Sequence, residues 1–220
     1  MTILDRPELD LPLSVAMRQG SMAQHTDAEN ATFTSELMAG RINEAGYADY
    51  LRALRVVYAA LEELGREMAG DPVAAQLHDP ALERLEAIEA DIAHWSGGGT
   101  LETDSPAAAA YAARIRAASG SATKFVAHHY TRYLGDLSGG LAIGRILDRT
   151  YGGTGQGLRF YDFASIERPK VYKDGYRERL DALPLDAAQR DEVVAEVQEA
   201  FRHNQALFDE LSGRMDAYRR

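Results

Sequence analysis

Apolar residues recur along most of this 220-residue chain at the three- and four-residue spacing of one helix face. The clearest run lies within residues 47–68 and comprises Tyr47, Tyr50, Leu51, Leu54, Val57, Tyr58, Leu61 and Leu64. Asn43 precedes it as a candidate N-cap, and the Gly-Asp-Pro sequence at residues 70–72 ends it. The pattern predicts a long amphipathic helix with one buried face.

The same signals predict helices along the rest of the chain. They run from Ser14 as N-cap through Met17, Met22 and His25, over Phe33–Ala39, after Asp79-Pro80, after Ser105-Pro106, over about Arg168–Ala182, and from Asp186 to about Met215. Another helix should run from about Ser121 to Tyr151, bent at its glycines, before a GGTGQG loop. We therefore expect an all-α, single-domain protein, with a flexible N-terminal extension at 1–13, the domain at 14–215 and a C-terminal tail at 216–220.

Composition narrows the chemistry. The chain has 45% hydrophobic residues, enough for one core, and no cysteine, so a metal must be held by His, Asp, Glu or Tyr. The net charge of −10 argues against nucleic-acid binding. The sequence has neither a signal-peptide pattern nor an apolar run of about 20 residues, so we expect a cytoplasmic protein without a membrane anchor. Asp91 and His94 have a metal-ligand spacing that occurs only once, and we expect a surface pair.

Four glycines interrupt the predicted helix in YLGDLSGGLAIG, residues 133–144. Each costs about 1 kcal/mol relative to alanine inside a helix. Gly135 and Gly139 are four residues apart and share a face, and Gly140 and Gly144 form a second such pair. Either another helix packs closely on this surface, or a flat ligand lies against the backbone where the helix bends or widens. Spacing alone favours neither explanation.

Polar residues beside these glycines favour a ligand site. Arg132 and Asp136 are four residues apart and could form an ion pair next to the bare surface. Tyr58 could join their hydrogen-bond network if its hydroxyl faces inward, although a core tyrosine is an equally good interpretation of its position.

A metal on a flat ligand would need a residue on the opposite side. His25 precedes Glu29 by one turn, and that carboxylate could accept the second imidazole N–H. His128 is a competitor, because it lies seven residues before Gly135 on the same face. Two groups of basic residues, Arg18 before His25 and the pair Lys173 and Arg177, could clamp paired carboxylates. A flat body, a metal ligand and carboxylate clamps together describe haem.

The segments HHYTRYLGDLSGGLAIGR and QHTDAENATF resemble the haem oxygenase family, whose distal-helix signature is YLGDLSGG. VVYAALEE, VYKDGYRER and FRHNQALF have counterparts in the same order. The resemblance implies an all-helical fold with haem between a proximal helix and a kinked distal helix. It also implies cleavage of haem b, both substrate and cofactor, by O2 and external electrons to biliverdin, ferrous iron and carbon monoxide, with biliverdin IXα as the expected isomer.

The resemblance also implies roles for individual residues. His25 matches the axial iron ligand, and Glu29 matches its hydrogen-bond partner. Gly135 and Gly139 match the distal glycines, Asp136 matches the carboxylate that orders distal water, and Arg132 and Tyr58 match the hydrogen-bond network of that carboxylate. The propionate-binding groups are matched by Arg18, Tyr130, Lys173 and Arg177, and Phe201 matches a further haem-binding residue. Arg18 stands where relatives can carry lysine, which changes reach and hydrogen-bond geometry. His128 matches a position that does not bind iron.

An electron donor must come from outside this chain. The resemblance implies ferredoxin or a ferredoxin or flavin reductase, and the basic residues Lys170, Lys173 and Arg177 offer a docking surface. Two other functions remain open from sequence. One is a haem carrier or sensor without turnover, for which Asp136 and its network would not be needed, and the other is a helical interaction module whose glycine face packs against a partner.

Overall fold

The structure is a computed structural model that describes residues 11–220, and within this range the regular elements are helices. The α-helices are α1 (Leu13–Gly20), α2 (Met22–Asn30), α3 (Thr32–Met38), α4 (Glu44–Glu67), α5 (Leu85–Trp95), α6 (Pro106–Arg116), α7 (Ala122–His129), α8 (Leu141–Thr150), α9 (Pro169–Asp181), α10 (Ala187–Ser212) and α11 (Met215–Tyr218). The 3-10 turns are η2 (Met68–Gly70), η3 (Ala74–Gln76), η4 (Pro80–Leu82) and η7 (Arg159–Tyr161). Two π-helical segments, η5 (Tyr130–Leu134) and η6 (Asp136–Gly140), join α7 to α8.

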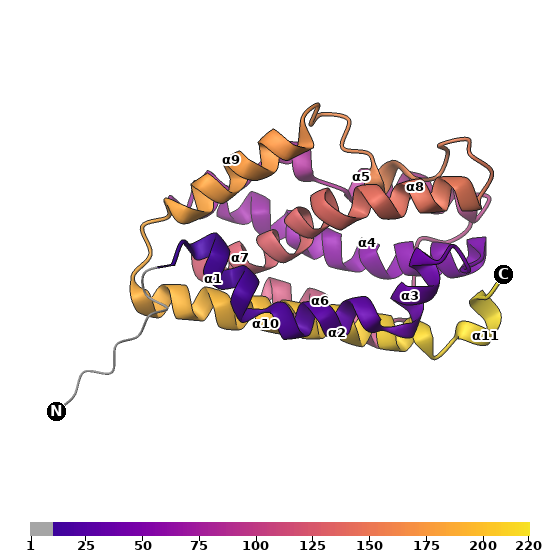
Figure 1. Cartoon of the computed structure of the whole chain (residues 1–220), viewed down its shortest axis with the longest axis horizontal. Coiled ribbons are helices and arrows are strands. Elements are labelled where there is room, and N and C mark those ends of the chain that lie inside the picture. The colour runs from indigo at the N-terminus through magenta and orange to yellow at the C-terminus, as the bar shows by residue number, and fades with distance from the viewer. Residues whose placement is uncertain (1–10) are drawn as a thin grey trace.

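The two longest helices, α4 and α10, carry the core. In Figure 1, α10 runs along the lower edge beneath α1 and α2, α4 runs through the middle, and α8 and α9 follow the upper edge. Helix α10 packs against α1, α2, α3, α6 and α7, and α4 packs against α5 and α6. None of the helices within residues 11–220 has the length and apolarity needed to cross a bilayer.

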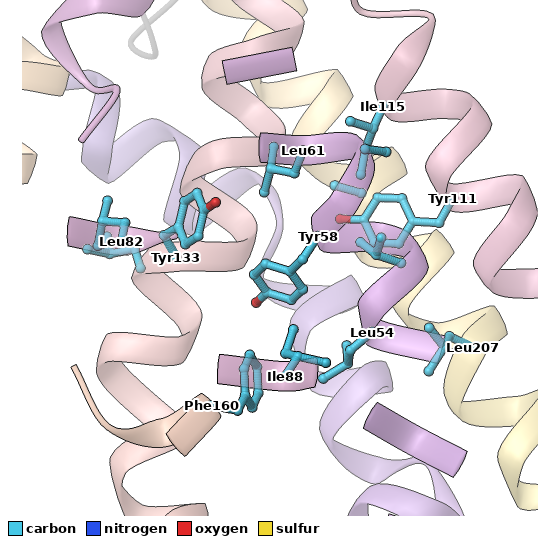
Figure 2. Packing of buried hydrophobic residues seen from close by; sticks show 14 of the residues in the cluster. Leu54, Tyr58, Leu61, Leu82, Ile88, Tyr111, Ile115, Tyr133, Phe160 and Leu207 are labelled. Atoms are coloured by element: carbon cyan, nitrogen blue, oxygen red, sulfur yellow. The ribbon is translucent and has the colours of Figure 1, made fainter. Parts of the chain in front are cut away.

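Helix α4 confirms the prediction from periodicity. The Asn43 side chain accepts a hydrogen bond from the Gly46 N–H at 2.9 Å and caps the helix. Its apolar face is buried, and Figure 2 shows Tyr58 of this helix among Leu54, Tyr133 and Phe160. The predicted caps Ser105 and Asp186 are also present, the latter in a complete capping box with Gln189.

The first predicted helix is wrong in two respects. Pro12 is the N-cap of α1, and Ser14 lies inside the helix, where its backbone N–H and hydroxyl donate to Asp181. The helix also does not continue to His25, because Ser21 departs from helical geometry with φ −108° and ψ 9° and separates α1 from α2. Gly20 is the strongest helix-breaking residue at this junction. Its lack of a side chain lets the backbone approach Val194 of α10, since a Cβ there would lie 2.5 Å from Val194 Cγ1.

Two other local expectations are corrected. Asp79 and Pro80 open only the short turn η4, since the Asp79 carboxylate accepts from Ala81 and α5 begins later at Leu85. Asp91 is not part of a surface pair. It is fully buried and accepts from the backbone N–H groups of Arg159 and Phe160 at 2.9 and 2.8 Å, so it holds η7 against α5.

The chain ends are as follows. Most of the predicted extension at 1–13 lies outside the described residues, and α1 begins at Leu13. Helix α10 stops at Ser212, and the segment predicted as a tail contains part of α11. The Tyr218 carbonyl accepts from the Asn43 N–H at 2.7 Å and Tyr218 is buried, so residues 216–218 pack against the start of α4.

Candidate functional site

A cavity of about 460 Å³ lies between α1 and α2 on one side and the π-helical segments on the other. Six residues singled out from the sequence line it: Arg18, His25, Tyr130, Gly135, Arg177 and Phe201. They come from five separate elements, α1, α2, η5, α9 and α10, and from the residue that joins η5 to η6. Cavities for small organic ligands commonly enclose about 300–1,000 Å³. The fold therefore gathers distant parts of the sequence around one ligand-sized space.

The proximal side of the cavity is formed by α2. His25 Nδ1 lies 3.5 Å from Glu29 Oε2, one helical turn away, and the edge of its ring packs against Phe201 with centroids 5.4 Å apart. Glu29 does not line the cavity itself. Because Nδ1 faces Glu29, Nε2 is the nitrogen left for a metal, and the carboxylate would fix the orientation and tautomer of the ring. The geometry agrees with the predicted pairing of these two residues.

His128 occupies a different environment. It is fully buried, it does not line the cavity, and its Nε2 lies 3.0 Å from the Glu196 carboxylate of α10. The side chain of Arg114 also donates to Glu196, with Nε at 2.7 Å from Oε1. These contacts give His128 a place in the packing of α7 on α10, and they leave His25 as the histidine at the cavity.

The two glycine pairs serve different neighbours. A Cβ built on Gly135 or Gly139 would meet nothing within 4 Å, so this side of the backbone faces open space. A Cβ on Gly140 or Gly144 would lie 3.1 or 2.9 Å from the Tyr161 side chain. The two pairs therefore have different surroundings, and the close contact at the second pair comes from η7. Gly135 and Gly139 leave room for a ligand, whereas Gly140 and Gly144 allow close packing by Tyr161.

The backbone at these glycines is wider than an α-helix. Residues 130–134 and 136–140 are π-helical, with hydrogen bonds closing a larger ring than in the α-form. Gly139 does not line the cavity but shares the open face of Gly135. The predicted long helix from about Ser121 to Tyr151 is thus confirmed as a continuous helical segment, and the expected distortion takes the form of widening.

Behind the glycines lies the predicted polar network. The Tyr58 hydroxyl donates a short hydrogen bond to Asp136 and accepts from Arg132 Nε and Nη2 at 3.2 and 3.0 Å. Arg132 Nη2 also lies 3.5 Å from Asp136 Oδ1. All three side chains are buried and none lines the cavity, although Asp136 directly follows Gly135. The core interpretation of Tyr58 and the network interpretation are both correct.

Burial changes the acid–base chemistry of this network. It raises the pKa of the Asp136 carboxyl above its ordinary value, and Arg132 and the Tyr58 hydrogen bond offset part of that rise. Burial likewise raises the pKa of Tyr58 well above its ordinary value, with Arg132 opposing it. A carboxyl group with a raised pKa can hold and release a proton closer to neutral pH.

Basic residues gather at the cavity mouth. Arg18 and Arg177 line the cavity with Tyr130, whose pKa is raised by burial and lowered in part by the charges of Arg177 and Arg18. Lys173 does not line it, but its Nζ lies 3.4 Å from the hydroxyl of Ser138, which does. The predicted cluster of cations therefore comes together from α1 and α9.

Two contributors were missed from the sequence. Asn204 of α10 accepts a hydrogen bond from Arg132 Nη1 at 2.7 Å and is itself buried. Asp174 of α9 accepts from Arg177 at 3.1 Å and lies 3.2 Å from Lys170. Asn204 falls three residues after Phe201 in FRHNQALF, so a polar residue on the buried side of α10 was the available signal.

Together, the helical fold and the cavity, with a histidine on one wall and glycine backbone on the other, define an all-helical protein with one ligand-sized candidate site. The family model described as heme oxygenase matches residues 11–210, and the chain belongs to the haem oxygenase family. This confirms the resemblance seen in the sequence.

Individual relatives agree with this assignment. The chain is 32% identical over 210 residues to heme oxygenase 1 of Synechocystis sp., covering 94% of this chain and 88% of that protein. It is 35% identical over 217 residues to heme oxygenase 1 of Homo sapiens, covering 94% of this chain and 75% of that one. These relatives are enzymes.

Solved structures extend the similarity to three dimensions. Heme oxygenase-1 from Synechocystis sp. PCC6803 in complex with heme gives a TM-score of 0.88 at 32% identity and covers 94% of this chain and 95% of that chain. Heme oxygenase from Leptospira interrogans gives a TM-score of 0.87 at 31% identity and covers 91% of this chain and 100% of that chain. The expected all-α fold is thereby confirmed.

Proposed function

We propose that this protein is a haem oxygenase that cleaves haem b with O2 and electrons from an external donor, yielding biliverdin, ferrous iron and carbon monoxide. The observation that carries the proposal is the arrangement of one cavity. A histidine stands on its proximal side, glycine backbone forms its distal side, and a buried acid network lies behind that backbone.

The residues present fit haem. A Cβ at Gly135 or Gly139 would enter open space, and such a side chain would occupy room needed by a flat macrocycle close to the backbone. His25 has one ring nitrogen turned to Glu29, which would leave the other to hold the iron. Arg18 and Arg177 at the mouth suit the two propionates. The ring body, the metal and the carboxylates each have a matching group.

Haem would supply the iron that binds O2 and the ring that is oxidised. The chain would hold the iron through His25 and orient the ring through Arg18, Tyr130, Lys173 and Arg177. Phe201 would pack beside the His25 imidazole that holds the iron, as its edge contact with His25 indicates. Gly135 and Gly139 would bring the backbone close to the oxygen side and exclude bulky groups from it.

Asp136 would manage the proton. Its raised pKa results chiefly from burial, and Tyr58 and Arg132 fix its orientation. Through water ordered beside Gly135, this carboxyl would deliver a proton to the oxygen side. A peroxidase-like site would place an imidazole there instead. A simple haem carrier has no use for such a buried acid, and this favours turnover over storage or sensing.

Several finer points belong to the same proposal. The basic clamp would fix the rotation of the ring and thereby select biliverdin IXα. Ferredoxin or a ferredoxin or flavin reductase would supply the electrons, docking beside the exposed Lys170 and the basic end of α9. We place the reaction in the cytoplasm, where such donors operate.

Haemin titration followed by turnover tests the proposal. Purified protein should bind one equivalent of haemin with a shifted Soret band, and reductant with O2 should then produce biliverdin and carbon monoxide. Absence of binding would reject every haem function. Binding without either product would instead support the carrier or sensor, and comparison with boiled protein controls for uncatalysed haem destruction.

A further inference from the structure

We infer that a clasp between Ser14 of α1 and Asp181 of α9 sets the spacing of Arg18 and Arg177, and so positions the two carboxylates of the ligand. The inference rests on the proposed function, because it assigns positioning residues to the same cavity. Neither Ser14 nor Asp181 was singled out as a site residue from the sequence.

The clasp joins segments far apart in the chain. The Ser14 backbone N–H donates to Asp181 Oδ1 at 2.8 Å, and the Ser14 hydroxyl donates to Asp181 Oδ2 at 3.0 Å. One residue therefore engages both oxygens of one carboxylate. Ser14 is buried and lines the cavity, so the clasp lies at the edge of the ligand space. Figure 1 shows α1 beside α9 at the same end of the molecule.

The register of the two helices connects the clasp to the cations. Arg18 follows Ser14 by four residues on α1, and Asp181 follows Arg177 by four residues on α9. Residues four apart lie on one helix face. Each arginine therefore stands one turn from the clasp on the face that carries it, and both arginines line the cavity. Because the clasp fixes one turn of α1 against one turn of α9, it limits how far apart the neighbouring turns that carry Arg18 and Arg177 can be.

The electrostatics of the helices explain why Asp181 turns to α1. A carboxylate at the C-terminus of its own helix is unfavourable with respect to the helix dipole, whereas one at an N-terminus is favourable. Helix α1 starts at Leu13, its N-cap Pro12 provides no side-chain cap, and its first N–H groups need acceptors. Asp181 supplies one from another helix. The contact thus caps α1 and ties it to α9 at once.

The functional consequence concerns a ligand with two carboxylates at a fixed separation. Arginine side chains are long, and the orientation of their guanidinium groups depends on where their helices lie. Arg177 is also held by Asp174 at 3.1 Å, so the α9 half of the clamp is already oriented. The clasp gives α1, and hence Arg18, a defined position relative to that half.

The test compares haemin with its dimethyl ester, in which both carboxylates are neutral. Asp181→Ala should raise the haemin dissociation rate about 10-fold, from the loss of two hydrogen bonds, and should leave dissociation of the ester within about 2-fold of wild type. Ser14→Ala keeps the N–H donor and should raise the haemin rate about 3-fold. Glu178→Ala is the matched control, since it removes an exposed carboxylate from the same helix and should change neither rate.

A purely structural clasp would give a different pattern, because loosening the fold weakens both ligands. Equal effects of Asp181→Ala on haemin and ester, or haemin dissociation equal to that of Glu178→Ala, would overturn the inference. If Asp181→Ala does not fold, as judged by helical circular dichroism, the same comparison with Ser14→Ala decides. Failure of wild-type protein to bind haemin or to form biliverdin would instead refute the proposed function, so the two failures are distinguishable.

Discussion

The proximal and distal walls of the cavity are built on opposite principles. On the proximal side the His25 and Glu29 side chains are 48% and 67% exposed, and Ala28 is the buried residue of α2. On the distal side Tyr58, Arg132 and Asp136 have residue exposures of 0%, 6% and 8%. The candidate metal ligand of the proximal wall is one exposed residue, His25. The distal wall depends on several buried polar groups that form hydrogen bonds with one another.

Because of this difference in burial, substitutions on the two walls should affect ligand binding and folding stability differently. A substitution at His25 removes little buried surface, so it should alter ligand binding without altering the fold. A substitution in the distal network leaves a buried partner unsatisfied, which costs about 1–3 kcal/mol in addition to any effect on chemistry. Stability and activity should therefore change independently on the proximal wall and together on the distal wall.

His25→Ala should produce the greatest loss of activity. Without an axial imidazole, the haemin spectrum should lose its histidine-ligated form and turnover should fall by at least about 100-fold, while the thermal midpoint of the ligand-free protein stays within about 2 °C of wild type. Absorption spectroscopy and biliverdin formation check this. His128→Gln is the control, and it should retain the wild-type spectrum. A wild-type spectrum in His25→Ala would mean that another residue binds the iron.

Asp136→Asn should separate haem binding from turnover on the distal wall. The amide keeps the size of the carboxyl but cannot hold the same proton, so biliverdin formation should slow by about 100-fold. Haemin affinity should change by less than about 3-fold, because the Asp136 side chain is buried behind the backbone and, unlike a side chain added at Gly139, would not enter the open space. Stopped-flow spectra under single turnover, with haemin titration, measure both. Turnover at the wild-type rate would remove Asp136 from the proton pathway.

The two glycine pairs allow a comparison within one helix. Gly144→Ala should destabilise the protein by about 1–3 kcal/mol, since its Cβ would lie 2.9 Å from Tyr161. Gly139→Ala should leave stability unchanged or raise it by up to about 1 kcal/mol, because its Cβ meets open space and alanine favours helix. Urea unfolding of the ligand-free proteins gives both values.

Haemin binding by the same variants should show the reverse order. Gly139→Ala should weaken haemin binding several-fold, while Gly144→Ala should bind it as wild type does once folded, since its Cβ would face Tyr161 instead of open space. If Gly139→Ala bound haemin as tightly as wild type, the open face of that pair would not be the ligand face.

The features that could be predicted from sequence are those that depend on residues close together in the chain. Helix α4 and its cap were predictable because periodicity and Asn43 act locally. The Arg132 and Asp136 pair was predictable because its members lie one turn apart. The division of labour between the glycine pairs was not, since it depends on where Tyr161, seventeen residues beyond Gly144, packs.

Long-range contacts also account for the errors. Ser14 has the residue type of an N-cap, but Asp181, which is 167 residues away, takes that function for α1. Asp91 looked like a surface residue because nothing nearby in sequence shows that η7 will fold over it. The role of Asn204 similarly requires the approach of α10 to Arg132. Motif and family pattern pointed to residues of which six line the cavity, and tertiary packing determined their partners.

The smallest effect should appear where the distal helix is anchored to α10. Burial would raise the pKa of Glu196, but the close contacts and charges of His128 and Arg114 together outweigh it and lower that pKa from 4.5 to about 2. Because the folded-state pKa is depressed, this group stabilises the protein above pH 4.5, and the contribution is lost as pH falls from 4.5 toward 2. Glu196→Gln should therefore be less stable than wild type at pH 7, with a difference that narrows on acidification.

Urea unfolding at several pH values between about 7 and 3.5 measures that difference. Glu199→Gln is a suitable control, since Glu199 lies on the same helix with its side chain 42% exposed and forms an ion pair with the nearby Arg202. A gap between wild type and Glu196→Gln that stays constant across this range would show that Glu196 stabilises the helix contact by packing alone. A narrowing gap, with haemin binding unchanged at pH 7, would place this anchor among the structural supports of the distal wall and outside its chemistry.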